Sequence, residues 1–167
     1  MTSQSEDDTK AFGRQLGTLL QGGDIVLLDG DLGAGKTRFA KGVAEGLGAS
    51  QTLTSPTFNL VLEYPLGVAE RTCSPKTLRH YDLYRLESPE QLDDLDYFGL
   101  LEDPDAVSLV EWGSKFSDSL PLEFLLVNIA TNSTDADVRT LQVSAEGTRP
   151  EELLTHFVAL RENEQHA

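Results

Sequence analysis

The chain has 167 residues, of which 28 are acidic and 13 basic, so its formal net charge is −15. A chain of this length is typical of one domain with a substantial core, and we expect residues 1–167 to form a single domain. The lone cysteine, Cys73, excludes an internal disulfide and a cysteine-based zinc site. No apolar run reaches the roughly 18 residues of a membrane span, and the polar, acidic start is unlike an export signal. These features favour a cytoplasmic protein.

The distribution of charge argues against direct binding to nucleic acid, because a strongly negative surface repels a phosphate backbone. In the sequence, basic residues gather only at Lys36, Arg38 and Lys41. Residues 87–105 contain eight acidic side chains and no basic one. This segment is either a solvated face or a docking surface for a basic partner, and the sequence leaves both interpretations open.

The first third of the chain predicts a helix, a strand, a glycine-rich loop and a second helix. The first helix begins at Ser5 or Thr9, ends at Gly22-Gly23, and has an apolar stripe made of Phe12, Leu16, Leu19 and Leu20. The short apolar run 24–29 has the length of a strand. The second helix covers 38–47, with Phe39, Val43 and Leu47 on one face.

The rest of the chain alternates strand and loop signals. We expect strands at 58–64, 78–84, 106–112, 123–131 and 138–145, separated by polar loops at 48–56 and 65–76. The last two strands are joined by only six residues, 132–137, which favours an antiparallel pair. Pro89 fits the first turn of a short acidic helix that ends near Asp96, and Pro150 opens a final amphipathic helix.

The most informative motif is Gly30-Asp-Leu-Gly-Ala-Gly-Lys-Thr37, which fits the phosphate-binding loop pattern G-x-x-x-x-G-K-T. Its glycines allow successive backbone N–H groups to point into one concavity, and the following helix adds the partial positive charge of its N-terminus. We expect Lys36 to face solvent and reach the β- and γ-phosphates, and the Thr37 hydroxyl to occupy a magnesium ligand position. The alternative, an ordinary glycine-rich turn before a helix, does not explain the match of motif and context.

Two acidic residues follow apolar runs and are candidates for magnesium or water positioning. Glu111 ends the run Val107-Ser-Leu-Val-Glu111, and Asp82 lies within Tyr81-Asp-Leu-Tyr84. A nucleotide site needs such a carboxylate in addition to a phosphate cradle. The alternative for each is a solvated residue at a strand end, and the sequence does not tell which of the two lies nearer the metal.

Four blocks together resemble the TsaE family, also called YjeE, the small bacterial ATPases of the threonylcarbamoyladenosine pathway. They are Gly30–Thr37, Ser55-Pro-Thr-Phe58, His80-Tyr-Asp-Leu-Tyr-Arg-Leu86 and Val110-Glu-Trp112. The resemblance implies an α/β fold, a P-loop NTPase-like three-layer domain with a mixed parallel and antiparallel sheet. It also implies magnesium-dependent ATP hydrolysis that is weak in isolation. The implied partners are TsaD and TsaB, which modify an adenosine of tRNA, so tRNA would be met only indirectly. The stretch between Tyr64 and His80 is longer than the family pattern.

The resemblance also carries residue roles. The implied catalytic residues are Lys36, Asp82 and Glu111, and the implied magnesium ligands are Thr37, Asp82 and Glu111. The implied ATP-binding residues are Gly33, Ala34, Gly35, Lys36, Thr37, Arg38, Thr9, Thr57 and Arg139. Within this set Thr57 has the character of a nucleotide-sensing hydroxyl, whereas Trp112 is expected to pack beside the site.

Three other classes compete with this interpretation. A P-loop small-molecule kinase would share the loop, but such kinases commonly use lid arginines, and after Arg85 only Arg139, Arg149 and Arg161 remain. A GTPase would carry an Asn-Lys-x-Asp motif, which the sequence lacks. A subunit that binds nucleotide without hydrolysis would have no need of Lys36, Thr37, Asp82 and Glu111 together.

Overall fold

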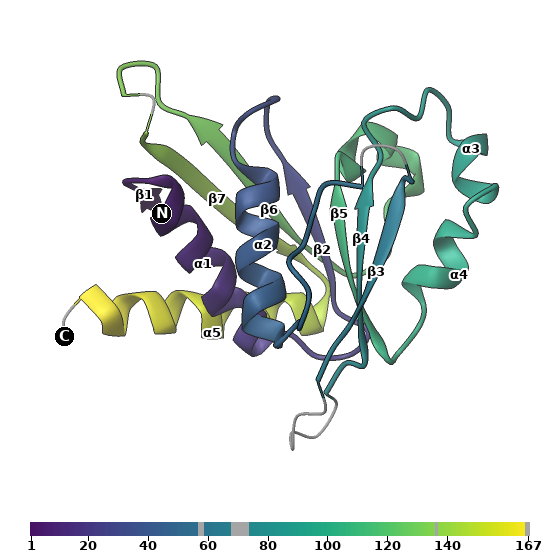
Figure 1. The fold of residues 1–167 in the computed structure, drawn as a ribbon, viewed down its shortest axis with the longest axis horizontal. Helices are drawn as coiled ribbons and strands as arrows, with labels where there is room; N and C mark the ends of the chain where they lie inside the picture. The colour runs from purple at the N-terminus through teal and green to yellow at the C-terminus, as the bar shows by residue number, and fades with distance from the viewer. Residues whose placement is uncertain (57–58, 68–73, 136, 166–167) are drawn as a thin grey trace.

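A mixed sheet forms the centre of the molecule. The computed structural model of the chain describes residues 1–56, 59–67, 74–135 and 137–165. Its strands are β1 (Thr2–Ser3), β2 (Ile25–Asp29), β3 (Val61–Pro65), β4 (Thr77–Asp82), β5 (Ala106–Glu111), β6 (Phe124–Thr131) and β7 (Arg139–Glu146). Within the described residues these seven strands pair in the order β1-β7-β6-β2-β5-β4-β3 (Figure 1). The pairs β2–β5, β2–β6 and β4–β5 are parallel, and β1–β7, β6–β7 and β3–β4 are antiparallel. The predicted mixed sheet is thereby confirmed.

Helices cover both faces of this sheet, which gives the three predicted layers. On one face lie α1 (Glu6–Leu19), α2 (Lys36–Leu47) and α5 (Thr148–Gln165). On the other lie α3 (Glu90–Asp93), α4 (Tyr97–Leu101) and a 3₁₀ helix at Gly113–Ser119. Strand β2 serves both cores, because Val26 and Leu28 enter the first cluster and Leu27 the second. Among the described residues, none of the helices is both long and apolar enough to cross a membrane.

Helix α1 begins directly after its N-cap residue, Ser5. The Ser5 side chain accepts a hydrogen bond from the Asp8 N–H at 3.0 Å, so Ser5 rather than Thr9 is the N-cap. Glu6, Asp7 and Asp8 fill the first turn, where negative charge is favoured by the helix dipole.

The elements that the sequence did not predict are short. Strand β1 has two residues and pairs with β7 through Ser3 and Arg139, too short a run to show a periodicity. The predicted acidic helix from Pro89 to about Asp96 is the shorter α3, and α4, which was not predicted, follows Asp96, whose φ of 49° separates the two helices. The final helix begins at Thr148, two residues before the predicted start at Pro150.

The long stretch after Tyr64 lies between β3 and β4, which form an antiparallel pair in which Tyr64 is the partner of Leu78. Residues 68–73, with Cys73, lie outside the described residues.

Helices α1 and α2 cross at unusually close range because glycines lie at the crossing. A Cβ added at Gly13 would lie 2.1 Å from the carbonyl oxygen of Phe39, and one added at Gly42 would lie 2.0 Å from that of Lys10. Neither obstacle is a flexible side chain, so the backbones themselves set the separation. This contact fixes α2, and with it the glycine loop at its N-terminus, against the N-terminal part of the fold.

We therefore expect Gly13→Ala to destabilise the protein. Alanine gains about 1 kcal/mol of helix propensity over glycine, but a methyl group driven into a backbone carbonyl must separate the helices. We expect a net loss of roughly 1–3 kcal/mol in the free energy of unfolding, measured by urea denaturation. Thr18→Ala, at an exposed position of the same helix, is the control and should leave stability unchanged or slightly raised. Equal stability of the Gly13 variant and wild type would disprove the close crossing.

Candidate functional site

The glycine loop connects the end of β2 to the start of α2, as predicted. Gly33 and Gly35 have φ values of 80° and 111°, in the left-handed region that residues with a Cβ rarely adopt. Among the described residues no side chain caps α2, which begins directly after Gly35. The first N–H groups of the helix therefore remain available to an anion.

Lys36 is held at the mouth of this loop. Its amine donates hydrogen bonds to the carbonyl oxygens of Gly30 at 2.6 Å and Asp31 at 3.0 Å. The amine also lies 4.0 Å from the centroid of the Trp112 ring, within range of a cation–π interaction. The prediction that Lys36 faces solvent was wrong, because the side chain folds back and only 5% of the residue is exposed. Burial lowers the pKa of Lys36, and the nearby carboxylates, Glu111 and Asp82 foremost, oppose that shift.

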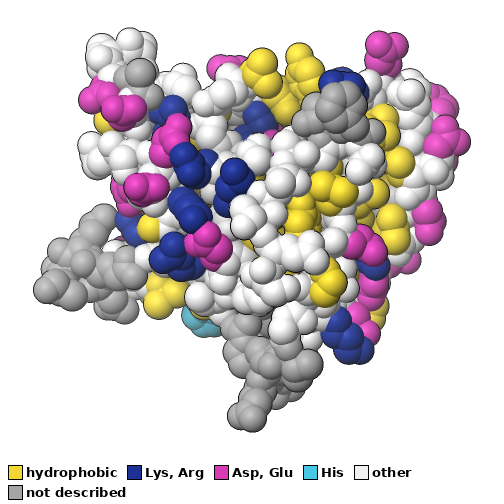
Figure 2. All heavy atoms as spheres, viewed as in Figure 1, with side chains coloured by type: hydrophobic (Ala, Val, Ile, Leu, Met, Phe, Trp, Pro, Cys, Tyr) yellow, Lys and Arg dark blue, Asp and Glu magenta, His cyan; other side chains and the backbone are white. Residues whose placement is uncertain are grey.

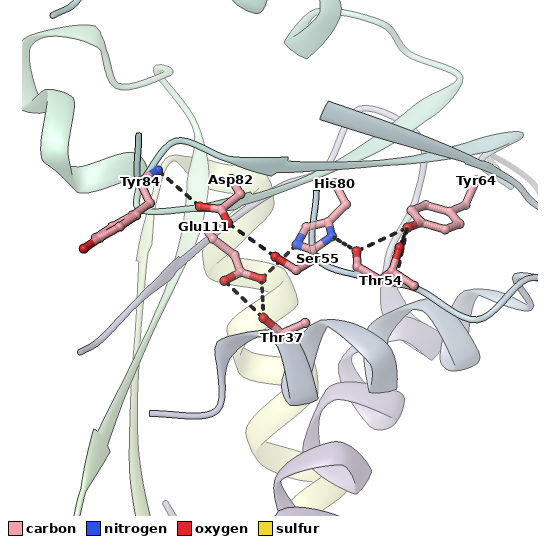
Figure 3. A network of polar contacts seen from close by, with 8 residues as sticks. All are labelled: Thr37, Thr54, Ser55, Tyr64, His80, Asp82, Tyr84 and Glu111. Carbon is pink, nitrogen blue, oxygen red and sulfur yellow. Dashed lines mark hydrogen bonds and ion pairs between the residues drawn. The ribbon is translucent and has the colours of Figure 1, made fainter. Parts of the chain in front are cut away.

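The two predicted carboxylates lie side by side. Asp82 ends β4, Glu111 ends β5, and the two are partners in the parallel register of these strands. The Thr37 hydroxyl, in the first turn of α2, donates to Glu111 Oε1 at 3.1 Å (Figure 3). Asp82 accepts hydrogen bonds from the Tyr84 N–H at 3.1 Å and from the Ser55 hydroxyl at 3.4 Å. The structure thus joins the glycine loop and both strand-end acids, which lie far apart in the sequence.

A pocket of about 350 Å³ lies between these groups. Its walls come from the glycine loop, from the first turn of α2 and from the ends of β4 and β5. They are formed by Leu32, Gly33, Gly35, Lys36, Thr37, Arg38, Ser55, Asp82, Tyr84, Arg85, Glu111 and Trp112. Tyr84 and Trp112 contact each other at 5.1 Å between ring centroids. The pocket combines a concave anion cradle with carboxylates, which is the arrangement that a nucleotide and its divalent cation require.

The donor set fits magnesium. The Thr37 hydroxyl and the carboxylates of Asp82 and Glu111 are hard oxygen donors on the same pocket wall. The described part of the chain contains no group of three or more His, Cys, Asp or Glu side chains that could hold a metal ion by itself. Magnesium in nucleotide sites is bound by one or two protein groups together with phosphates and waters, so a complete protein cage is not needed.

The remaining predicted nucleotide residues are placed differently from one another. Arg38 lines the pocket and forms an ion pair with Glu6. Arg139 supports the glycine loop from β7, since its Nε donates to the Ala34 carbonyl at 2.9 Å, and Thr9 of α1 lies near Gly35. Thr9 is buried, with its hydroxyl 2.6 Å from that of Ser3. Contact of Thr9 and Arg139 with a nucleotide stays a prediction, and Thr57 lies outside the described residues.

Sequence reasoning assigned no role to His80, which the structure places at the centre of the polar network (Figure 3). The imidazole is fully buried, and its Nε2 lies 2.9 Å from Glu111 Oε1. The sequence did contain a signal for His80: in a strand, alternate residues share a face, so Leu78 and His80 lie on the same face of the sheet as the candidate acid Asp82. That signal could not show that Glu111, on another strand, would meet the ring.

This chain is similar to known proteins over most of its length. The family model described as "Threonylcarbamoyl adenosine biosynthesis protein TsaE" matches residues 3–141. The protein named tRNA threonylcarbamoyladenosine biosynthesis protein TsaE in Bacillus subtilis is 38% identical over 148 residues, which cover 88% of this chain and 85% of the relative. Its namesake in Streptomyces coelicolor is 38% identical over 144 residues, 84% and 92% of the two chains. A crystal structure of Bacillus subtilis YdiB superposes with a TM-score of 0.72 at 33% identity and covers 96% of this chain and 94% of its own.

The position of Lys36 predicts the effect of removing its amine. We expect Lys36→Ala to weaken nucleotide binding by at least about 10-fold, because a hydrogen bond from a charged donor contributes about 1.5–3 kcal/mol. Isothermal titration calorimetry with ATP would measure this. Lys41→Ala, a lysine of the same helix outside the pocket walls, is the control and should bind normally. Near-normal affinity of a folded Lys36→Ala protein would overturn the assignment of the pocket.

Proposed function

Because this chain belongs to the TsaE family, we propose that it is a magnesium-dependent ATPase required for the synthesis of N6-threonylcarbamoyladenosine in tRNA. One observation carries the proposal: Lys36 and Thr37 of the glycine loop share a pocket with the paired carboxylates Asp82 and Glu111. We propose further that residues 1–167 form a single P-loop ATPase domain that acts in the cytoplasm.

Each residue then has a distinct task. The N–H groups of the loop and of the first turn of α2 bind the phosphates, and the Lys36 amine neutralises charge on the β- and γ-phosphates. The Thr37 hydroxyl and Glu111 hold the magnesium ion, which when bound polarises the phosphoryl oxygens. Asp82 faces the same pocket from the neighbouring strand and positions the attacking water. Trp112 and Tyr84 restrict access of bulk water to the Lys36 amine.

A P-loop small-molecule kinase is the alternative, and one observation favours it. Arg85 and Arg38 both line the pocket, and arginines at such sites stabilise a transferred phosphoryl group. The two functions differ in the fate of the phosphate. Phosphate release with ATP as the sole substrate supports hydrolysis, whereas transfer of the phosphoryl group to an added metabolite, with no release of free phosphate, supports a kinase.

Glu111 provides the sharpest test of the proposed chemistry. Glu111→Gln keeps the shape and removes the charge, so we expect turnover to fall at least about 10-fold while ATP affinity changes much less. Phosphate release and calorimetry, both with magnesium present, would measure the two effects. Glu146→Gln, at the end of β7, is the matched control. Unchanged turnover would make Glu111 a structural residue and transfer its role to Asp82.

We propose that the partners are TsaD and TsaB and that tRNA is met only through them. Figure 2 shows Lys and Arg side chains gathered over α1 and α2. Glu45 pairs with Lys10 and Arg14 of α1, and Glu6 pairs with Arg38 of α2, so each of these three basic side chains is already engaged in an ion pair. Such a surface gives little attraction for a phosphate backbone.

The acidic segment 87–105 supports docking on protein. Asp103 and Asp105 pair with Arg79 and Lys76, but Asp93 and Asp94 are exposed at the end of α3. Exposed acidic side chains that lie outside such ion pairs attract a basic surface on a partner, and salt screens that attraction.

We therefore expect the isolated protein to show no appreciable tRNA binding in a gel shift, and to bind a TsaD–TsaB complex when ATP is present. Removing two charges with Asp93→Asn and Asp94→Asn should weaken that binding and reduce its dependence on salt in a pull-down. Glu151→Gln with Glu152→Gln, an exposed pair on α5, is the control. Tight binding of tRNA to the isolated chain, or no association with TsaD–TsaB at any salt concentration, would contradict the proposal.

A further inference from the structure

His80 connects the Glu111 carboxylate to a rigid part of the fold. Its side chain is wholly buried on β4, with one ring nitrogen directed to each side. Nε2 lies 2.9 Å from Glu111 Oε1, and Nδ1 lies 3.3 Å from the Thr54 carbonyl oxygen. Thr54 is held in turn, since its N–H donates to the Tyr64 hydroxyl at 3.0 Å (Figure 3). The ring therefore has little freedom to move.

This contact determines which way the carboxylate faces. Glu111 Oε1 accepts a hydrogen bond from the Thr37 hydroxyl at 3.1 Å and lies 2.9 Å from His80 Nε2, which donates to it in the tautomer that carries the proton on Nε2. The second oxygen, Oε2, is 3.5 Å from the Thr37 hydroxyl and is the less engaged of the two. Fixing one oxygen of a carboxylate leaves the other directed at a defined point, here in the wall of the nucleotide pocket.

Burial makes the imidazole donor necessary. The Glu111 side chain is only 4% exposed, and a buried carboxylate without hydrogen-bond donors is strongly disfavoured. Without His80, the one proton of the Thr37 hydroxyl could not satisfy both oxygens, and the carboxylate would turn toward water. That hydroxyl is the group with which it must share a cation, so the geometry of the magnesium site would be lost.

We propose that His80 is a positioning residue that sets the Glu111 carboxylate for magnesium-linked nucleotide binding. The inference rests on the proposed magnesium-dependent function. It gives His80 the role of holding a magnesium ligand in place without itself contacting the ion. His80 is not among the residues that line the nucleotide pocket, and its burial keeps it from solvent. Its effect passes through Glu111.

The test is the ratio of ATP affinities with and without magnesium, measured by calorimetry under conditions too brief for turnover or with a non-hydrolysable ATP analogue. The change in fluorescence of Trp112, the single tryptophan, is an independent readout of binding. Removal of an outer-shell partner typically lowers metal affinity about 10–100-fold. We therefore expect His80→Ala to reduce the magnesium-dependent gain in affinity at least about 10-fold and to leave the magnesium-free affinity unchanged.

Two conservative variants separate positioning from mere filling of space. The amide of His80→Gln reaches the position of Nε2 and keeps a donor to Glu111, so the magnesium-dependent gain should return. The shorter amide of His80→Asn reaches only toward the Thr54 carbonyl, and it should fail as His80→Ala does. Tyr81→Phe is the matched control, because Tyr81 is the next residue of β4 and packs in the cluster on the opposite face of the sheet. If His80→Ala does not fold, the Asn and Gln pair decides the question.

The outcomes distinguish this inference from the function on which it rests. If wild type shows no gain in affinity with magnesium, the magnesium-dependent function is overturned, and the role of His80 with it. If wild type shows the gain and folded His80→Ala and His80→Asn retain it, only the role of His80 is overturned. Equal losses in the Asn and Gln variants would also overturn it, because a purely structural defect does not depend on which amide reaches Glu111.

Discussion

The parallel pairing of β2, β5 and β4 is the constraint on which the site depends. Because the strands are parallel, their carboxyl ends lie at one edge of the sheet, where the glycine loop also begins. The register aligns Leu28 with Glu111 and Glu111 with Asp82. A slip of one residue in β5 would turn Glu111 to the opposite face of the sheet, away from Thr37. The arrangement of these side chains is therefore a consequence of strand register, and the buried Val and Leu residues of these strands enforce that register from both faces.

Residues that act within one short segment were predictable from the sequence, and residues that act through contacts between segments were not. The glycine loop is contiguous, so the order of Gly33, Gly35, Lys36 and Thr37 already contains its geometry. Asp82 and Glu111 could be named because each ends a strand, but their pairing depends on strand order. His80 was missed for that reason. The exposure of Lys36 was wrongly predicted because the two carbonyl groups that bind its amine belong to the fold of the loop and not to any pattern of side chains.

The close crossing of α1 and α2 was likewise not predictable from the sequence. Glycines at 13, 17, 42 and 46 are unremarkable as single residues of two helices, and helix propensity alone counts against them. Their role becomes visible only when α1 and α2 are placed together, where each glycine meets the other backbone. This contact brings Thr9 on α1 against the loop, and β7 brings Arg139 there from the other end of the chain. The phosphate loop is thus supported on its outer side by segments that are more than a hundred residues apart.

Trp112 links the carboxylate strand to the lysine of the loop. It follows Glu111 directly and adopts a φ of 65°, which is uncommon for a residue with a bulky side chain. Its N–H donates to the Leu28 carbonyl at 3.1 Å, its ring lies over the Lys36 amine, and Tyr84 contacts it from the end of β4. Strain of this kind persists only where surrounding contacts hold it. The Lys36 amine therefore has three neighbours in one place, the Gly30 and Asp31 carbonyl oxygens and the Trp112 ring. Because Trp112 follows Glu111 directly, a single peptide bond joins the residue that lies over the Lys36 amine to the carboxylate residue that His80 contacts.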